Sequence, residues 1–101
     1  MADSILDVVH ESARELHDAG LMDEMTMREF DALCLPPITQ YSASQIKQIR
    51  TRSKASQAVF AAYLNTSRST VQKWEQGVKK PNGAALKLLN LVDRKGLDVL
   101  L

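Results

Sequence analysis

The stretch SQAVFAAYLNTSRSTVQKWEQG, residues 56–77, restricts the possible folds of this chain more than any other part of it. Ser56 and Ser67 each precede a run of apolar residues at helical spacing, and serine is a preferred N-cap residue. Only residues 65–67 separate the two runs, and Gly77 is placed to end the second one. The stretch therefore predicts two short helices joined by a tight turn.

The residue types in this stretch suit two helices that cross closely. Ala61 is small where the helices would meet, and Asn65 tolerates the left-handed backbone conformation that such a turn often needs. Two short helices with a three-residue connection have the spacing of a helix-turn-helix unit. Their predicted inward faces consist of Phe60, Leu64, Val71 and Trp74.

Polar and basic residues are left for the outer side of the second helix. Arg68, Ser69, Gln72 and Lys73 occupy its exposed side, where a recognition helix presents side chains to base edges in the major groove. The basic loop that follows, at positions 79 and 80, is suited to contact phosphates. Solvated surface charges are the alternative interpretation of these residues. The pattern favours contact with double-stranded DNA.

The residues around this stretch extend the helical pattern. Ser42 or Ser44 can cap a helix SQIKQIRTRSK, whose Ile46 and Ile49 would face inward. VKKPNG is expected to turn, AALKLLNLVDRK to form another helix, and LDVLL to add a last apolar stretch. We therefore expect residues 42–101 to form an all-α domain of five helices.

The segment before this domain has a different pattern. SILDVVHESARELHDAG places apolar residues on one helical stripe, which predicts a helix. The following LMDEMTMREFDALCLPPITQY is compatible with a short helix or an extended segment, and the prolines at 36 and 37 end whatever precedes them. We therefore predict a partly helical N-terminal extension, residues 1–41, before the domain 42–101.

Charge is segregated between these two parts of the chain, although the net charge of the whole is only +1. Residues 1–41 contain nine acidic residues against Arg14 and Arg28, a net charge of −7. Residues 42–101 contain eleven basic residues against three acidic ones, a net charge of +8. Such asymmetry indicates different partners, nucleic acid for the basic part and a basic molecule for the acidic part.

Simple features argue against a secreted or membrane protein. Cys34 is the single cysteine and cannot form an internal disulfide, and the acid-rich start MADSILD does not resemble a secretory signal. No apolar run approaches the roughly 18 to 20 residues of a membrane span. We expect a cytoplasmic protein that does not bind membranes.

The chain also lacks the residue patterns of an enzyme. His10 and His17 are seven residues apart in HESARELH, and the HExxH zinc motif requires a spacing of four. We therefore expect both to be surface histidines. Paired catalytic carboxylates, a nucleophile with its base and a phosphate-binding loop are also missing from the pattern. We expect no catalytic residue, no cofactor and no bound metal.

The run SQAVFAAYLNTSRSTVQKWEQG, with Pro81 shortly after it, carries a known pattern, and through it residues 44–95 resemble the Cro/cI-like (Xre) family of repressors. The resemblance implies a Cro/cI-like fold, a homodimer that binds operator DNA, and a phosphate contact by Gln57. It also implies an internal ion pair between Arg50 and Glu75. The positions that carry it are Ser56, Gln57, Ala61, Leu64, Ser67, Thr70, Val71, Trp74, Glu75, Gly77 and Pro81.

The chain departs from the Xre pattern at three positions. Lys54 replaces a glycine usual in the first turn, Asn65 replaces the turn glycine, and Thr66 replaces the hydrophobic residue that usually follows. These departures bear on the geometry of the turns and leave the expected fold unchanged. With the family pattern included, the predicted DNA-binding residues are Gln57, Thr66, Arg68, Ser69, Thr70, Gln72, Lys73, Lys79 and Lys80.

A second resemblance concerns the order of the two parts. The run NTSRSTVQKWEQGVKKPNGAALKLLNLV after an acidic segment is similar to the HigA-type antitoxins of bacterial toxin–antitoxin pairs. It implies that the chain represses its own operon and that a separate segment binds a RelE/HigB-like ribonuclease toxin. A stand-alone repressor is the alternative. The predicted toxin-binding residues are Leu6, Val9, Ala13, Leu16, Met27, Phe30 and Leu33.

Overall fold

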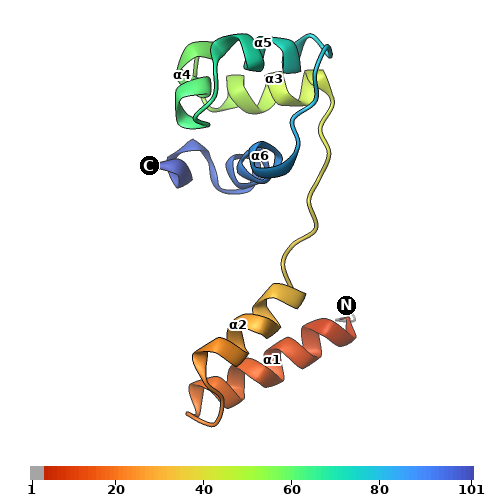
Figure 1. Cartoon of the computed structure of the whole chain (residues 1–101), viewed down its shortest axis with the longest axis vertical. Coiled ribbons are helices and arrows are strands. Elements are labelled where there is room, and N and C mark those ends of the chain that lie inside the picture. The colour runs from red at the N-terminus through yellow and green to blue at the C-terminus, as the bar shows by residue number, and fades with distance from the viewer. Residues whose placement is uncertain (1–3) are drawn as a thin grey trace. The chain divides into compact units, whose positions relative to one another are not determined.

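The computed structural model describes residues 4–101, and all regular secondary structure in this range is helical (Figure 1). The expected all-α fold class is therefore confirmed for the described residues. The α-helices are α1 (Ile5–Asp18), α2 (Glu24–Leu33), α3 (Ala43–Arg52), α4 (Gln57–Tyr63), α5 (Arg68–Glu75) and α6 (Gly83–Lys95), followed by a short 3₁₀ helix, η1 (Leu97–Leu100).

The chain divides into two compact units, Met1–Pro37 and Ile38–Leu101. In its described part the second unit has four α-helices and the 3₁₀ helix η1, so the expected count of five helices is not confirmed. The sequence analysis had placed a boundary between Tyr41 and Ser42. The structural division lies earlier because residues 38–41 bond to α6.

Two side chains of α6 hold this entering segment. The buried Asn90 accepts a hydrogen bond from the Thr39 N–H at 2.8 Å and donates one from Nδ2 to the Thr39 carbonyl at 3.0 Å. The Tyr41 hydroxyl donates to Asp93 at 2.7 Å. Burial and this hydrogen bond raise the pKa of Tyr41 to about 12. The segment is thus part of the second unit's structure.

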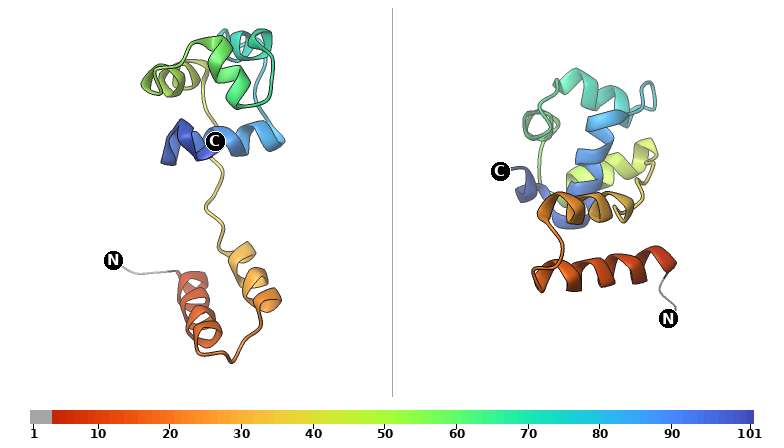
Figure 2. Two further views of the ribbon diagram at one scale, coloured as in Figure 1. Left: turned by 90° about the vertical axis from the view of Figure 1, so that its left-hand side faces the viewer. Right: turned by 60° about the horizontal axis from the view of Figure 1, so that its bottom comes forward.

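The first unit is a helical hairpin in which α1 and α2 lie side by side and antiparallel (Figures 1 and 2). Ser4 and Asp7 form a reciprocal capping box that begins α1. The Asp23 carboxylate accepts from the Thr26 N–H at 2.7 Å and begins α2. For the run after residue 20, the sequence was compatible with a short helix or an extended segment. The structure has a helix there, α2.

The second unit is built around one apolar core that α6 closes against α3, α4 and α5 (Figures 1 and 2). Ser42, Ser56 and Ser67 are the N-caps of α3, α4 and α5, and each hydroxyl accepts a backbone N–H three residues ahead. The predicted caps are therefore confirmed. The buried core residues are Ile46, Ile49, Phe60, Ala61, Leu64, Val71, Trp74, Leu89 and Val92.

Candidate nucleic-acid interface and candidate protein-binding face

Helices α4 and α5 form the predicted pair, with their apolar residues turned into the core. Phe60 and Val71 are fully buried, and Leu64 and Trp74 are nearly so. Ala61 is also buried, as expected for the place where the two helices approach closely. Burying this face fixes the angle between the helices and leaves the opposite side of α5 to present its side chains.

The turns on either side of α4 keep left-handed conformations without glycine. Lys54 has a φ of 57° and Asn65 a φ of 55°. These are two of the positions at which the chain departs from the Xre pattern, and both residues adopt a left-handed conformation that glycine would favour. After Asn65, the Thr66 N–H donates to the Ala61 carbonyl at 2.9 Å, which ties the turn to α4.

Most of the predicted recognition residues are accessible. Arg68, Ser69, Gln72 and Lys73 are exposed on α5. Thr70 is half-buried, and its hydroxyl lies 2.8 Å from the hydroxyl of the cap residue Ser67. That contact makes Thr70 part of the helix cap. Thr66 is likewise half-buried within the turn.

The basic loop after α5 folds back on the end of that helix. The N–H groups of Val78 and Lys79 both donate to the Lys73 carbonyl, at 3.0 and 3.3 Å. Lys79 and Lys80 are exposed, and Pro81 behind them is buried. The loop thus brings two exposed ammonium-bearing residues next to the backbone of the last basic residue of α5.

A buried ion pair joins α3 to the end of α5, as the resemblance implied. Arg50 Nε donates to Glu75 Oε2 at 2.7 Å, Nη2 donates to Oε1 at 2.9 Å, and the side chains are 14% and 6% exposed. Arg50 Nη1 also donates to the Ala55 carbonyl at 3.0 Å. Burial alone would raise the pKa of Glu75, but hydrogen bonds from Arg50 and Gln57 outweigh burial and lower it.

Gln57 belongs to the same network. Its Nε2 donates to Glu75 Oε1 at 3.4 Å, which holds the amide at the first turn of α4. The sequence analysis assigned Gln57 to a phosphate contact and did not foresee this bond. The geometry orients the amide through Glu75 and Arg50, so α3, α4 and α5 are linked at one point.

The predicted protein-binding residues lie on the hairpin, which has an apolar groove on one side. The groove has a volume of about 230 Å³ and draws its walls from both helices and from the loop between them. Val9, Ala13, Leu16 and Phe30 were predicted and line it. Val8, Ser12 and Met22 line it and were missed.

The other predicted residues of the hairpin lie elsewhere. Met27 is buried and lines no part of the groove, while Leu6 and Leu33 are exposed outside it. The prediction drew the helical stripe through positions 6, 9, 13 and 16. On α1 the groove is lined at positions 8, 9, 12, 13 and 16, so the prediction was right at 9, 13 and 16, and the pair Val8 and Ser12, four residues apart, could have completed it.

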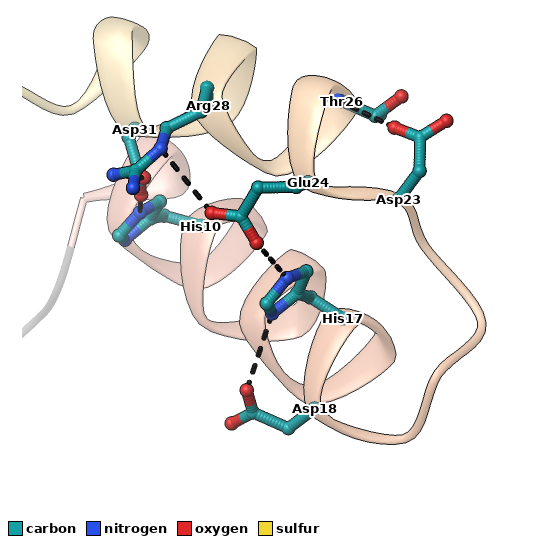
Figure 3. A network of polar contacts seen from close by, with 8 residues as sticks. All are labelled: His10, His17, Asp18, Asp23, Glu24, Thr26, Arg28 and Asp31. Carbon is teal, nitrogen blue, oxygen red and sulfur yellow. Dashed lines mark hydrogen bonds and ion pairs between the residues drawn. The ribbon is translucent and has the colours of Figure 1, made fainter.

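Polar pairs also connect the two helices (Figure 3). His10 Nε2 lies 2.7 Å from Asp31 Oδ1, and His17 Nε2 lies 2.5 Å from Glu24 Oε2. Arg28 Nε lies 3.3 Å from Glu24 Oε1, and Arg28 Nη1 lies 3.7 Å from Asp31 Oδ2. Both histidines are partly exposed, as expected for surface residues, and each also bridges from α1 to α2, which the sequence did not predict.

Comparison with known proteins places the second unit in a family. Residues 46–100, slightly more than half of the chain, match the family described as Helix-turn-helix. The chain belongs to this family. The match begins within α3, so the hairpin lies outside it.

The chain is also similar to Antitoxin HigA-2 from Vibrio cholerae serotype O1, with 47% identity over 53 residues. The aligned region is 52% of this chain, and it spans about half (51%) of the length of this curated relative. The resemblances to Xre proteins and to HigA-type antitoxins are thereby confirmed. Within residues 4–101, no helix is long and apolar enough to cross a membrane.

Proposed function

We propose that this chain is the antitoxin of a type II toxin–antitoxin system, with one unit for each of two partners. The second unit binds operator DNA and represses transcription of its own operon. The hairpin neutralises a RelE/HigB-like ribonuclease toxin. The observation that carries the proposal is the combination of a helix-turn-helix unit with a separate acidic hairpin whose apolar groove is uncovered. The similarity to an antitoxin supports it.

DNA binding is supported by the outer side of α5 and the loop after it. Arg68 and Gln72 are exposed at the start and middle of a helix whose opposite side is fixed in the core. Side chains so placed can reach base edges, while Lys79 and Lys80 fit phosphates. One such unit reads only a few base pairs, so we propose a homodimer on two half-sites about 34 Å apart.

Toxin binding is supported by the chemistry of the groove and its edge. Val8 and Ser12 line the groove and also a neighbouring hollow bounded by Asp7 and Glu11. A ribonuclease attracts RNA phosphates with basic side chains, so an apolar surface edged with carboxylates fits such a protein. A second hairpin fits less well, because two segments of net charge −7 repel each other.

Both activities belong to the cytoplasm, and one experiment tests them together. The full chain is co-expressed with the product of the neighbouring gene, purified, and tested on the promoter DNA of the same operon. A stable complex that protects a palindromic site is the expected result. DNA protection without any co-purifying protein would support the stand-alone repressor instead. Sedimentation of the chain as a monomer, both free and on DNA, would contradict the dimer.

A further inference from the structure

Both histidines of the chain are used in the same way. His10 and His17 are one heptad apart on α1, and each faces a carboxylate on α2, Asp31 and Glu24 respectively (Figure 3). The two contacts lie near opposite ends of α2, so together they fix how α1 lies along α2. The second unit contains no histidine.

The hairpin depends on these contacts because its apolar core is small. Ala13 and Met27 are its buried residues within the described part of the chain. A two-helix segment of this length buries too little apolar surface to be held firmly by that alone. The groove has walls on both helices, Leu16 on α1 and Phe30 on α2, so it exists only while the helices stay together.

We propose that His10 and His17 are positioning residues that hold α1 against α2, and that protonation of His17 strengthens this hold and thereby stabilises the apolar groove. The regulatory meaning of this inference rests on the proposed function of the groove. Neither histidine is assigned a contact with the partner. Acting through the spacing of the helices, they would make the hairpin a better binding surface at mildly acidic pH than at alkaline pH.

Carboxylates face both histidines, and around His17 they favour the protonated imidazole. His17 faces Glu24 on α2 and Asp18 on its own helix, and His10 faces Asp31 on α2. The opposing positive groups are Arg28, which contacts Glu24 and Asp31, and Arg14, which acts on Asp31 from a greater distance. Three carboxylates therefore surround two imidazoles, and Arg28 offsets two of them only in part.

The direction of the pH dependence follows from the pKa shifts of His17 and Asp31. Hydrogen bonds to Glu24 and then Asp18 raise the pKa of His17 above its usual 6.5. The stabilisation from His17 is complete below about pH 6.5 and is lost as pH rises through the raised pKa. The hydrogen bond with His10 lowers the pKa of Asp31 below 3.8, so its contribution is lost only in stronger acid. The hairpin is tightest between these limits.

Amide hydrogen exchange on the full chain tests the proposal without any partner. Protection factors of α1 and α2, corrected for intrinsic exchange, should be higher at pH 5.5 than at pH 7.5, by roughly two- to fivefold. Amides of α3 to α6 serve as the internal control, because no histidine lies in that unit. Equal hairpin protection at the two pH values would overturn the proposal.

Variants separate a proton-dependent role from simple packing. His17→Gln should abolish the pH effect, whereas His10→Gln should lower hairpin protection through the loss of its contact with Asp31. Glu29→Gln, at an exposed position on α2, is the matched control, and it should leave the pH effect unchanged. If a histidine variant loses all hairpin protection, NMR titration of His17 in the unaltered chain decides: a midpoint at or below 6.5 would refute the proposal.

These measurements are independent of toxin binding. A hairpin that tightens with acid while the chain captures no protein would leave the inference standing and remove the proposed function. A chain that captures its toxin equally well from pH 5.5 to 7.5, with unchanged hairpin protection, would support the proposed function and overturn this inference.

Discussion

The hairpin and the helix-turn-helix unit both consist of α-helices joined by short turns or loops, but different interactions hold them together. In the second unit, buried residues from α3 to α6 form a continuous core with Phe60 and Leu89 fully enclosed. In the hairpin, Ala13 and Met27 are buried and much of the contact between helices is polar. Large apolar side chains such as Ile5, 83% exposed, remain in solvent.

This difference shows two ways of preparing a surface for a partner. The helix-turn-helix unit completes its core and then displays polar side chains such as Arg68 on a rigid helix. The hairpin displays the apolar side chains that a completed core would have covered, including Val9 and Leu16. The first arrangement suits a polar ligand of fixed shape, and the second suits a protein that supplies the missing part of the core.

Removing the hairpin gives the largest expected effect. A chain that begins at Ile38 keeps the contacts of Thr39 and Tyr41 with α6, so it should fold and bind operator DNA. It should fail completely to rescue cells that express the toxin, because the groove is gone. Cell survival and DNA binding are measured for this chain and the full chain. If both chains protect the cells equally, a stand-alone repressor is the better interpretation.

A large-to-small substitution in each unit tests the contrast between their cores. Phe60→Ala should destabilise the second unit by about 3 to 5 kcal/mol, because it opens a cavity in an enclosed core. Leu16→Ala removes a 45% exposed side chain and should cost less than about 1 kcal/mol. Urea unfolding followed by Trp74 fluorescence and by circular dichroism measures both. Similar losses would show that the hairpin has a core of comparable quality.

The buried Arg50–Glu75 pair should contribute more to the free energy of unfolding than the polar pairs of the hairpin do. Arg50→Ala or Glu75→Ala should each cost about 2 to 4 kcal/mol, because each leaves an unpaired charge with little access to water. The double variant should cost clearly less than the sum. A double-mutant cycle from urea denaturation measures the coupling, and additive losses would mean that the two charges are independently solvated.

Within the DNA-binding face, base readout and phosphate contact can be separated. Arg68→Ala should weaken operator binding by about 1 to 3 kcal/mol and reduce discrimination at one base position. Lys79→Ala should weaken all sequences alike and reduce the slope of log affinity against log salt by about one. Titrations of operator and random DNA at several salt concentrations measure both. Equal weakening on random DNA would make Arg68 a phosphate contact.

The smallest effect concerns the turns. Lys54 holds a left-handed conformation in the second unit, whereas the turn after α1 uses Gly20 at a φ of 78°. Lys54→Gly should stabilise the second unit by up to about 1 kcal/mol, because glycine adopts this conformation without steric cost. Asn65→Gly should gain less, since asparagine already tolerates it. Thermal unfolding measures both, and a loss of stability at Lys54 would indicate a contact by its side chain.

The sequence predicted the second unit better than the hairpin for a physical reason. Serine caps, a glycine stop and enclosed residues such as Phe60 and Trp74 leave strong local patterns. The hairpin's cohesion comes from His10 with Asp31 and His17 with Glu24, pairs up to 21 residues apart. No local pattern marks such pairs, so both histidines were assigned to the surface.

The candidate sites follow the same division. Exposure of Arg68 and Lys73 follows directly from the positions of Val71 and Trp74 in the same helix, so spacing was enough to find them. The bond from Gln57 to Glu75 depends on how α4 packs against α5, and spacing within one helix cannot reveal it. The exposure of a side chain can thus be predicted from the spacing within one helix, whereas a contact between two helices cannot.

The two hydrogen bonds between Thr39 and Asn90 affect the order in which the chain folds. They join residues 51 positions apart, and the Tyr41–Asp93 bond joins residues 52 apart, whereas α4 and α5 are neighbours in the chain. Closing a long loop costs more entropy than closing a short one, so distant contacts form late. During synthesis the segment 38–41 can form these bonds only after α6 has left the ribosome. This segment is therefore among the last parts of the chain to reach its native structure.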